Sequence, residues 1–98
     1  MGAGGVPNRT VEIIYGRSGD LATQVSKPNS RYDLISNGKR IQSRWYDAEG
    51  KVVRNRDYIH QDVFKNHVFP HDHIWSWING KPIRDIAPVS PDYLRYKD

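Results

Sequence analysis

The histidines of this chain are concentrated in one short segment. All four lie between residues 60 and 73: His60, His67, His71 and His73. If residues 71–78 (HDHIWSWI) form a strand, alternation points His71 and His73 to the same side. Imidazole titrates near neutral pH, so one ring can take up a proton while a second ring donates one. Cleavage of RNA needs such a pair at the 2′-OH and at the leaving oxygen. We therefore expect acid–base catalysis from His71 or His73, with His60 as a further candidate.

A pair of histidines two residues apart also suits metal binding. His-x-His on a strand is a common ligand pair for zinc and other transition metals. In a regular strand Asp72 points to the opposite face, so a third ligand would have to be His60, His67 or an acidic residue such as Asp62. The spacing matches no closed structural zinc site, so we expect no cofactor, with zinc as the alternative. A third interpretation is structural, with the imidazole rings packed beside the two nearby tryptophans.

Two sharp turns organise the middle of the chain into hairpins. Asn37-Gly38 supplies the two positive φ angles of a type I′ turn, and residues 47–50 (DAEG) suit a type I turn closed by a glycine bulge. Unbroken alternation from these turns makes Leu34 face Ile41 and Arg44 face Arg54. The predicted core face consists of Tyr32, Leu34, Ile41, Ser43, Trp45 and Val53. The predicted basic face consists of Arg31, Asp33, Arg40, Gln42, Arg44, Tyr46, Arg54, Arg56 and Tyr58.

The basic face offers groups that can hold phosphate. Arginine binds phosphate oxygens in pairs, and tyrosine rings give nucleotide bases a surface for stacking. Like charges opposed across strands destabilise a sheet by up to about 1 kcal/mol, and a bound phosphate would relieve that repulsion. The predicted phosphate-binding residues are Arg31, Arg44, Arg54, Arg56 and Tyr46. Tyr58 is a catalytic candidate that orients the substrate or stacks on it. The alternative is a solvated sheet face whose charges are partly balanced by Asp33 and Asp57.

The remaining segments complete a β-rich architecture. Strands are predicted at 10–15, 31–36, 39–46, 51–58 and 71–78, and Asn79-Gly80 turns the chain back toward 83–85. Residues 16–30 are predicted as a loop with a short helical turn at 21–25. The tail is expected to be extended, with Tyr93 and Tyr96 packed on the surface. The fold class is therefore mainly β, with α+β as the alternative: a small antiparallel β-meander of four to five strands with at most one short helix.

Composition limits the class of protein. The 98 residues are enough for one domain, predicted at 9–98 after a flexible lead-in at 1–8. The net charge of +4 favours an anionic partner such as nucleic acid. Cysteine is absent, which excludes disulfides and thiolate metal sites, and no apolar run approaches the roughly 20 residues that cross a bilayer. No phosphate-binding loop, dinucleotide fingerprint, nucleophile elbow or zinc-protease helix is found.

Several short motifs within 30–84 carry a resemblance by their order. They are Arg44-Trp45-Tyr46-Asp47, Gly50-Lys51, Arg56-Asp57-Tyr58 and Pro70-His71-Asp72-His73-Ile74-Trp75. In this order they resemble the small C-terminal effector modules of bacterial polymorphic toxins and related prophage-encoded proteins. The resemblance covers a little more than half of the chain. It implies a toxin domain released from a larger exported protein, acting in the target-cell cytoplasm and neutralised by a cognate immunity protein. It also implies a metal-independent nuclease, with His71, His73, Arg44, Arg56 and Tyr58 as the positions that carry over.

These observations lead to one main hypothesis and two alternatives. The main hypothesis is a small bacterial toxin-type nuclease, a metal-independent endoribonuclease in which histidines provide acid–base catalysis and arginines hold the phosphate of RNA. The first alternative is a non-catalytic binding or structural module of a phage or secreted bacterial assembly. The second alternative is a metal-binding domain that uses the His-x-His pair. The main hypothesis requires the histidines and the arginines to meet in space, which the pairing of the strands decides.

Overall fold

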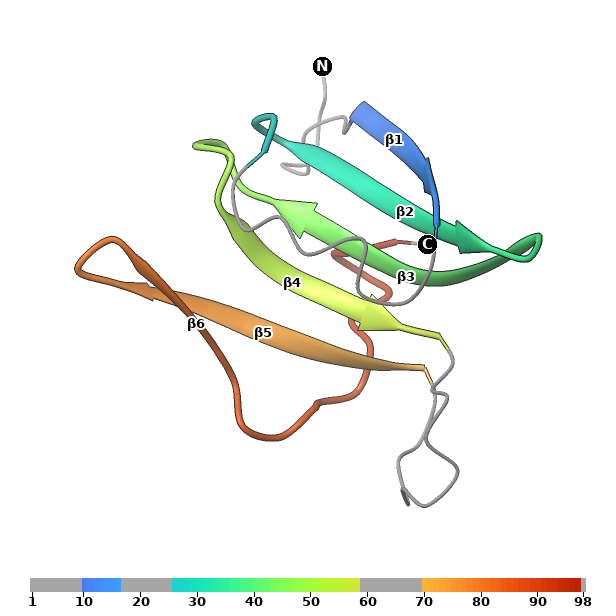
Figure 1. The fold of residues 1–98 in the computed structure, drawn as a ribbon. Helices are drawn as coiled ribbons and strands as arrows, with labels where there is room; N and C mark the ends of the chain where they lie inside the picture. The colour runs from blue at the N-terminus through green and yellow to red at the C-terminus, as the bar shows by residue number, and fades with distance from the viewer. Residues whose placement is uncertain (1–9, 17–25, 59–69, 98) are drawn as a thin grey trace.

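The computed structural model describes residues 10–16, 26–58 and 70–97, and within these ranges the chain forms strands and no helix. The strands are β1 (Thr10–Tyr15), β2 (Ser30–Ser36), β3 (Lys39–Tyr46), β4 (Val52–Asp57), β5 (His71–Ile78) and β6 (Lys81–Arg84). They form one open sheet in the order β1-β2-β3-β4-β5-β6 (Figure 1). The mainly β class is confirmed, with six strands instead of four to five. The predicted lead-in at 1–8, the helical turn at 21–25 and the residues His60, Asp62 and His67 lie outside the described residues.

The direction of β1 differs from the prediction. β2 to β6 follow one another as antiparallel neighbours, which is the predicted meander. β1 instead runs parallel to β2, with Thr10 beside Ser30 and Tyr15 beside Ile35. Parallel neighbours need a crossover connection of about a dozen residues or more, and residues 16–29 supply that length. The sheet is therefore mixed.

Gly50 closes the turn between β3 and β4 in a conformation that side chains rarely adopt. Its φ is +83°, and an added Cβ would collide with the backbone carbonyl of Ser26. Gly38, in the type I′ turn, has a similar φ of +77° but nothing within 4 Å of an added Cβ. A side chain would strain the backbone at both positions, but it would collide with neighbouring atoms only at Gly50.

We expect Gly50→Ala to lower the free energy of unfolding by about 3 kcal/mol and Gly38→Ala by only about 1 kcal/mol. The smaller loss reflects the left-handed backbone alone, whereas the larger loss adds displacement of the chain at Ser26. Urea denaturation of both variants measures the difference. Equal losses would show that the contact at Ser26 imposes no constraint.

A β-bulge interrupts the hairpin between β2 and β3. Ser36 faces Lys39 as predicted, but the register shifts between Leu34 and Ile35, so Leu34 faces Gln42. The predicted partner of Leu34 was Ile41, and the predicted register is wrong from this point onward. A bulge adds one residue to one strand, which moves the following side chains to the opposite face.

A second bulge interrupts the hairpin between β3 and β4. Tyr46 faces Val52 as predicted, but the register then shifts, and Arg44 faces Asn55. The predicted opposition of Arg44 and Arg54 is therefore wrong. The two arginines lie on opposite faces of the sheet, so the like-charge repulsion across this pair of strands does not arise.

The corrected register defines two faces, because cross-strand partners point to the same side. The histidine face includes Ile14, Tyr32, Leu34, Gln42, Arg44, Tyr46, Asn55, Asp57, His71 and His73. The arginine face includes Arg31, Asp33, Ser43, Trp45, Arg54, Arg56 and Asp72. The predicted core and basic faces are each divided between them. The apolar core is correspondingly small, with Leu34 and Ile41 packed on one side and Trp45 buried on the other.

The C-terminal segment, residues 85–97, crosses the arginine face and runs behind β3 and β4 in Figure 1. Val89 exchanges two backbone hydrogen bonds with Asp72, both 2.8 Å long. The ring of Tyr96 lies edge-on to Trp45, with centroids 5.6 Å apart. The packing expected for Tyr96 is thus present, and a turn at 93–95 interrupts the extended chain.

Candidate metal centre between β4 and β5

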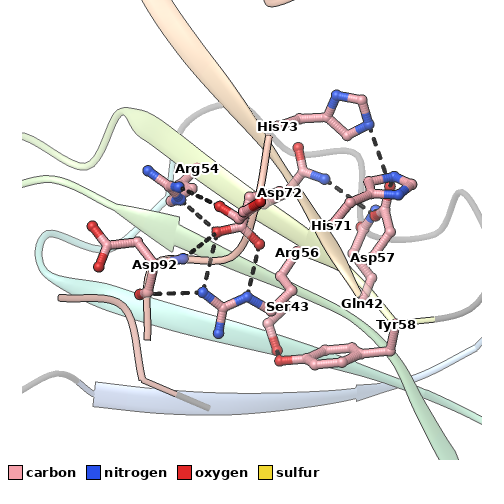
Figure 2. Close-up of polar contacts among 12 residues, drawn as sticks. Gln42, Ser43, Arg54, Arg56, Asp57, Tyr58, His71, Asp72, His73 and Asp92 are labelled. Carbon is pink, nitrogen blue, oxygen red and sulfur yellow. Dashed lines mark hydrogen bonds and ion pairs between the residues drawn. The ribbon is translucent and has the colours of Figure 1, made fainter. Parts of the chain in front are cut away.

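Three side chains with metal-ligand atoms meet on the histidine face. Asp57 and His71 are direct partners across β4 and β5, and His73 follows on the same face. Asp57 Oδ2 lies 3.3 Å from His71 Nε2 and 3.6 Å from His73 Nε2. One ligand atom from each residue lies within 4.8 Å of the other two. Figure 2 shows the two imidazoles beside Asp57. The cluster combines two nitrogen donors with one oxygen donor.

A second carboxylate orients His73. Asp85 Oδ1 lies 2.8 Å from His73 Nδ1, while Asp85 Oδ2 accepts a hydrogen bond of 2.8 Å from the Ile74 amide. A carboxylate accepts the hydrogen bond, so the Nδ1 atom of the imidazole carries the proton. In neutral His73 the lone pair therefore lies on Nε2, the atom that points toward Asp57. Metal-bound histidines in proteins are held by a carboxylate in the same way.

Two amides orient Asp57. Gln42 Nε2 donates to Asp57 Oδ1 at 2.7 Å, and Asn55 Nδ2 donates to the same oxygen at 3.2 Å. Trp75 Nε1 donates to Asn55 Oδ1 at 2.8 Å, which fixes the direction of that amide. The hydrogen bonds to Oδ1 leave Oδ2 directed at the imidazoles.

The cluster is largely removed from solvent. Asp57, His71 and His73 are 9%, 4% and 8% exposed. A buried carboxylate is stable only when its charge is compensated, and a divalent cation beside Oδ2 would compensate it. Two imidazole nitrogens and one carboxylate oxygen form a donor set of zinc and non-haem iron sites, whereas magnesium and calcium prefer oxygen donors. The residues present therefore fit a transition-metal ion.

Sequence reasoning found part of this cluster. His71 and His73 share a face, as alternation along the strand predicted. Asp57 was missed because the register between β4 and β5, which places it opposite His71, joins two strands that no short turn connects. Asp85 was missed because it reaches His73 from the chain beyond β6. The third ligands expected from sequence lie outside the described residues, and Asp57 takes that place among the described ones.

A different cluster surrounds Asp72 on the arginine face. Its carboxylate accepts hydrogen bonds from Arg54 Nε at 2.6 Å and from Arg56 Nε at 2.7 Å. Arg56 Nη2 and the Asp92 amide add bonds of 3.1 and 3.3 Å. Asp72 and Arg56 are both 0% exposed. Figure 2 shows the two guanidinium groups converging on this carboxylate. Two of the predicted phosphate-binding arginines are therefore engaged by a buried acidic residue.

The sheet separates most of the predicted phosphate-binding arginines from the predicted catalytic histidines. Arg31, with a bond of 2.8 Å to Asp33, joins Arg54 and Arg56 on the arginine face. Tyr58 donates a hydrogen bond of 3.1 Å to Ser43 on that face as well. Arg44 and Tyr46 do share the histidine face, and both are buried. The structure thus brings the two described histidines together with acidic residues and amides instead of with an arginine stripe.

Tyr46 has an altered acidity that affects stability at high pH. Burial raises the pKa of its hydroxyl to about 12, with Arg44 opposing the shift and Tyr32 adding to it. In the unfolded chain the pKa is about 10. Tyr46 therefore loses its proton at lower pH in the unfolded state, and the stability that Tyr46 contributes is complete below pH 10 and lost as pH rises toward 12.

We expect the free energy of unfolding of the wild type to fall relative to that of Tyr46→Phe between pH 10 and 12. Denaturation curves at several pH values test this, and a constant difference between the two proteins would contradict it.

No family model, curated protein or solved structure matches this chain. None of the described residues forms a helix that is long and apolar enough to span a bilayer. The geometry of the Asp57–His71–His73 and Asp72–Arg54–Arg56 clusters is therefore the basis for proposing a function.

Proposed function

We propose that this domain binds one divalent transition-metal ion, with zinc as the first candidate, through Asp57, His71 and His73. The observation that carries the proposal is the approach of both Nε2 atoms to one carboxylate oxygen, at 3.3 and 3.6 Å. The hydrogen bond between Asp85 and His73 adds the orienting carboxylate that such sites use.

The proposed centre suits hydrolysis. A zinc ion with three protein ligands keeps a fourth position for water and lowers the pKa of that water to about 7. In this chain Asp57 supplies the negative charge, Asp85 holds the ring of His73, and Gln42 holds Asp57. We propose the phosphodiester of a nucleic acid as the substrate class, because the net charge of +4 favours a polyanion.

Zinc affinity and stoichiometry test the metal site. Equilibrium dialysis of the wild-type chain is expected to give one equivalent of bound zinc. His71→Ala is expected to lower the affinity at least about 100-fold, and Asp85→Asn about 10- to 100-fold because Asp85 only orients a ligand. Glu49→Gln removes an exposed carboxylate in the turn before β4, at the opposite end of that strand from Asp57, and serves as the matched control. Equal zinc binding by the wild type and His71→Ala would refute the assignment.

A metal-free ribonuclease is the second candidate function. The contact between His73 Nδ1 and Asp85 Oδ1 favours it, since a carboxylate in this position orients a histidine that acts as a general base. His71 lies beside it, with ring centroids 5.1 Å apart, and could serve as the acid.

Incubation with RNA and DNA, with and without EDTA, separates the two candidates. RNA cleavage that persists in EDTA and disappears in His73→Ala supports acid–base catalysis. Cleavage that disappears in EDTA supports the metal centre. A folded sample that cleaves no nucleic acid contradicts both nuclease assignments and favours a binding module, even when zinc binds.

A further inference from the structure

Among the described residues of the sheet, the arginine face has more guanidinium groups than carboxylates. Its described guanidinium groups belong to Arg31, Arg40, Arg54 and Arg56, whereas its described sheet carboxylates belong to Asp33 and Asp72. Four cations thus face two anions. Arg40 Nη1 lies 3.8 Å from Asp33 Oδ2, and the same oxygen forms an ion pair with Arg31.

The C-terminal segment supplies neutral acceptors to this face. Arg31 Nη1 donates to the Lys97 carbonyl at 3.0 Å. Arg54 Nη2 donates to the Ser90 carbonyl at 3.4 Å, and Arg56 Nη2 donates to the Asp92 carbonyl at 3.3 Å. Carbonyl oxygens accept hydrogen bonds without cancelling charge. Phosphate oxygens at the same places would form stronger, charge-assisted bonds with the guanidinium groups.

The same segment places aromatic rings over the arginines. The guanidinium of Arg56 lies 4.5 Å from the ring centroid of Tyr93, and that of Arg54 lies 5.1 Å from the centroid of Tyr96. Nucleotide bases stack on arginine and on aromatic side chains in single-stranded complexes. The segment therefore presents both acceptor oxygens and flat rings to the arginines, and a single-stranded nucleic acid offers the same two kinds of group.

We infer that the arginine face is a binding surface for single-stranded nucleic acid, and that the C-terminal segment occupies it in the free chain. An acidic peptide would satisfy the charge but would lack the flat rings that lie over Arg54 and Arg56. Displacement of the segment would uncover Trp45, which is 1% exposed in the free chain and contacts Tyr96, so the bound nucleic acid must cover that ring in its place. This surface lies on the face opposite the proposed metal centre and does not depend on it.

Fluorescence anisotropy with a labelled 12-nucleotide 2′-O-methyl RNA tests the inference. The modified strand has no free 2′-OH, and EDTA removes metal ions, so neither proposed cleavage reaction affects the result. We expect wild-type binding to weaken with salt, with a slope of about −2 in log K against log salt if three phosphates are contacted. Tyr96→Ala weakens the competing segment and is expected to tighten binding about 5- to 10-fold. Leu94→Ala changes an exposed residue of the same segment and is expected to leave binding unchanged.

Hydrogen exchange of the wild type gives a readout that needs no variant. The Val89 amide donates to the Asp72 carbonyl at 2.8 Å, so displacement of the segment should accelerate its exchange when the oligonucleotide binds. Absence of binding, binding that leaves Val89 protected, or tighter binding of poly-glutamate than of the oligonucleotide would each overturn the inference. If Tyr96→Ala fails to fold, the exchange of Val89 in the wild type decides.

Discussion

Asp72→Asn is expected to lower the free energy of unfolding by about 3–5 kcal/mol, the cost of breaking a buried ion pair by removing one partner. Asp72 is 0% exposed and binds Arg54 at 2.6 Å and Arg56 at 2.7 Å. Asparagine keeps the shape of the side chain but removes its charge, so the loss cannot be attributed to a cavity. Arg56, also 0% exposed, would remain buried without its carboxylate partner. A loss of this size is a large part of the roughly 5–15 kcal/mol that stabilises a typical domain.

Urea denaturation of Asp72→Asn beside Glu49→Gln isolates the effect of burial. Glu49 also pairs with a cation, Lys51, at 3.1 Å, but its side chain is 73% exposed. Exposed pairs of this kind contribute about 1 kcal/mol or less. If both substitutions cost the same small amount, the charge of Asp72 does not hold the arginine face together.

Zinc is expected to raise the melting temperature of the wild type by roughly 10–20 °C at a free concentration 100 times the Kd. Binding to the folded state alone adds about 2.7 kcal/mol at that concentration, and a domain of this size gains about 4–8 °C per kcal/mol. Asp57 and His71 lie side by side only when β4 and β5 are paired, so the unfolded chain has no equivalent metal site.

The zinc-induced shift should disappear in His71→Ala and persist in Glu49→Gln. The change caused by zinc within each protein is compared, because His71→Ala can alter the melting temperature without metal. A shift of the same size in His71→Ala would place the bound zinc elsewhere in the chain.

The strands of this sheet could be predicted from sequence because their ends are marked by turns. Asn37-Gly38 has φ values of 52° and 77°, as a type I′ turn requires, and β3 follows it with the predicted bounds. The parallel direction of β1 could not be predicted, because TVEIIY specifies a strand but not its neighbour. Pairing of distant segments depends on the whole sheet.

The candidate site was only half accessible to sequence reasoning for the same reason. His71 and His73 were found together because alternation within one strand is local. Asp57 joins them through the register between β4 and β5, two strands that no short turn connects, so the sequence does not specify which of their residues face each other. The second bulge, between β3 and β4, moves Arg54 to the face opposite Arg44, and the pairing of β4 with β5 brings Arg54 beside Asp72. One extra residue therefore divides the predicted arginine stripe between the two faces, and Arg54 and Arg56 form a buried ion-pair cluster with Asp72 of β5.

The most direct test of the proposed metal centre is anomalous diffraction at the zinc edge from crystals of the zinc-loaded protein. We predict one anomalous peak within about 2.0–2.2 Å of His71 Nε2, His73 Nε2 and Asp57 Oδ2. The present spacing of these atoms, 3.3 and 3.6 Å from the carboxylate oxygen, leaves room for an ion among them after small adjustments. An ordered Asp57–His71–His73 cluster with no anomalous peak, or with the only peak elsewhere, would contradict the assignment.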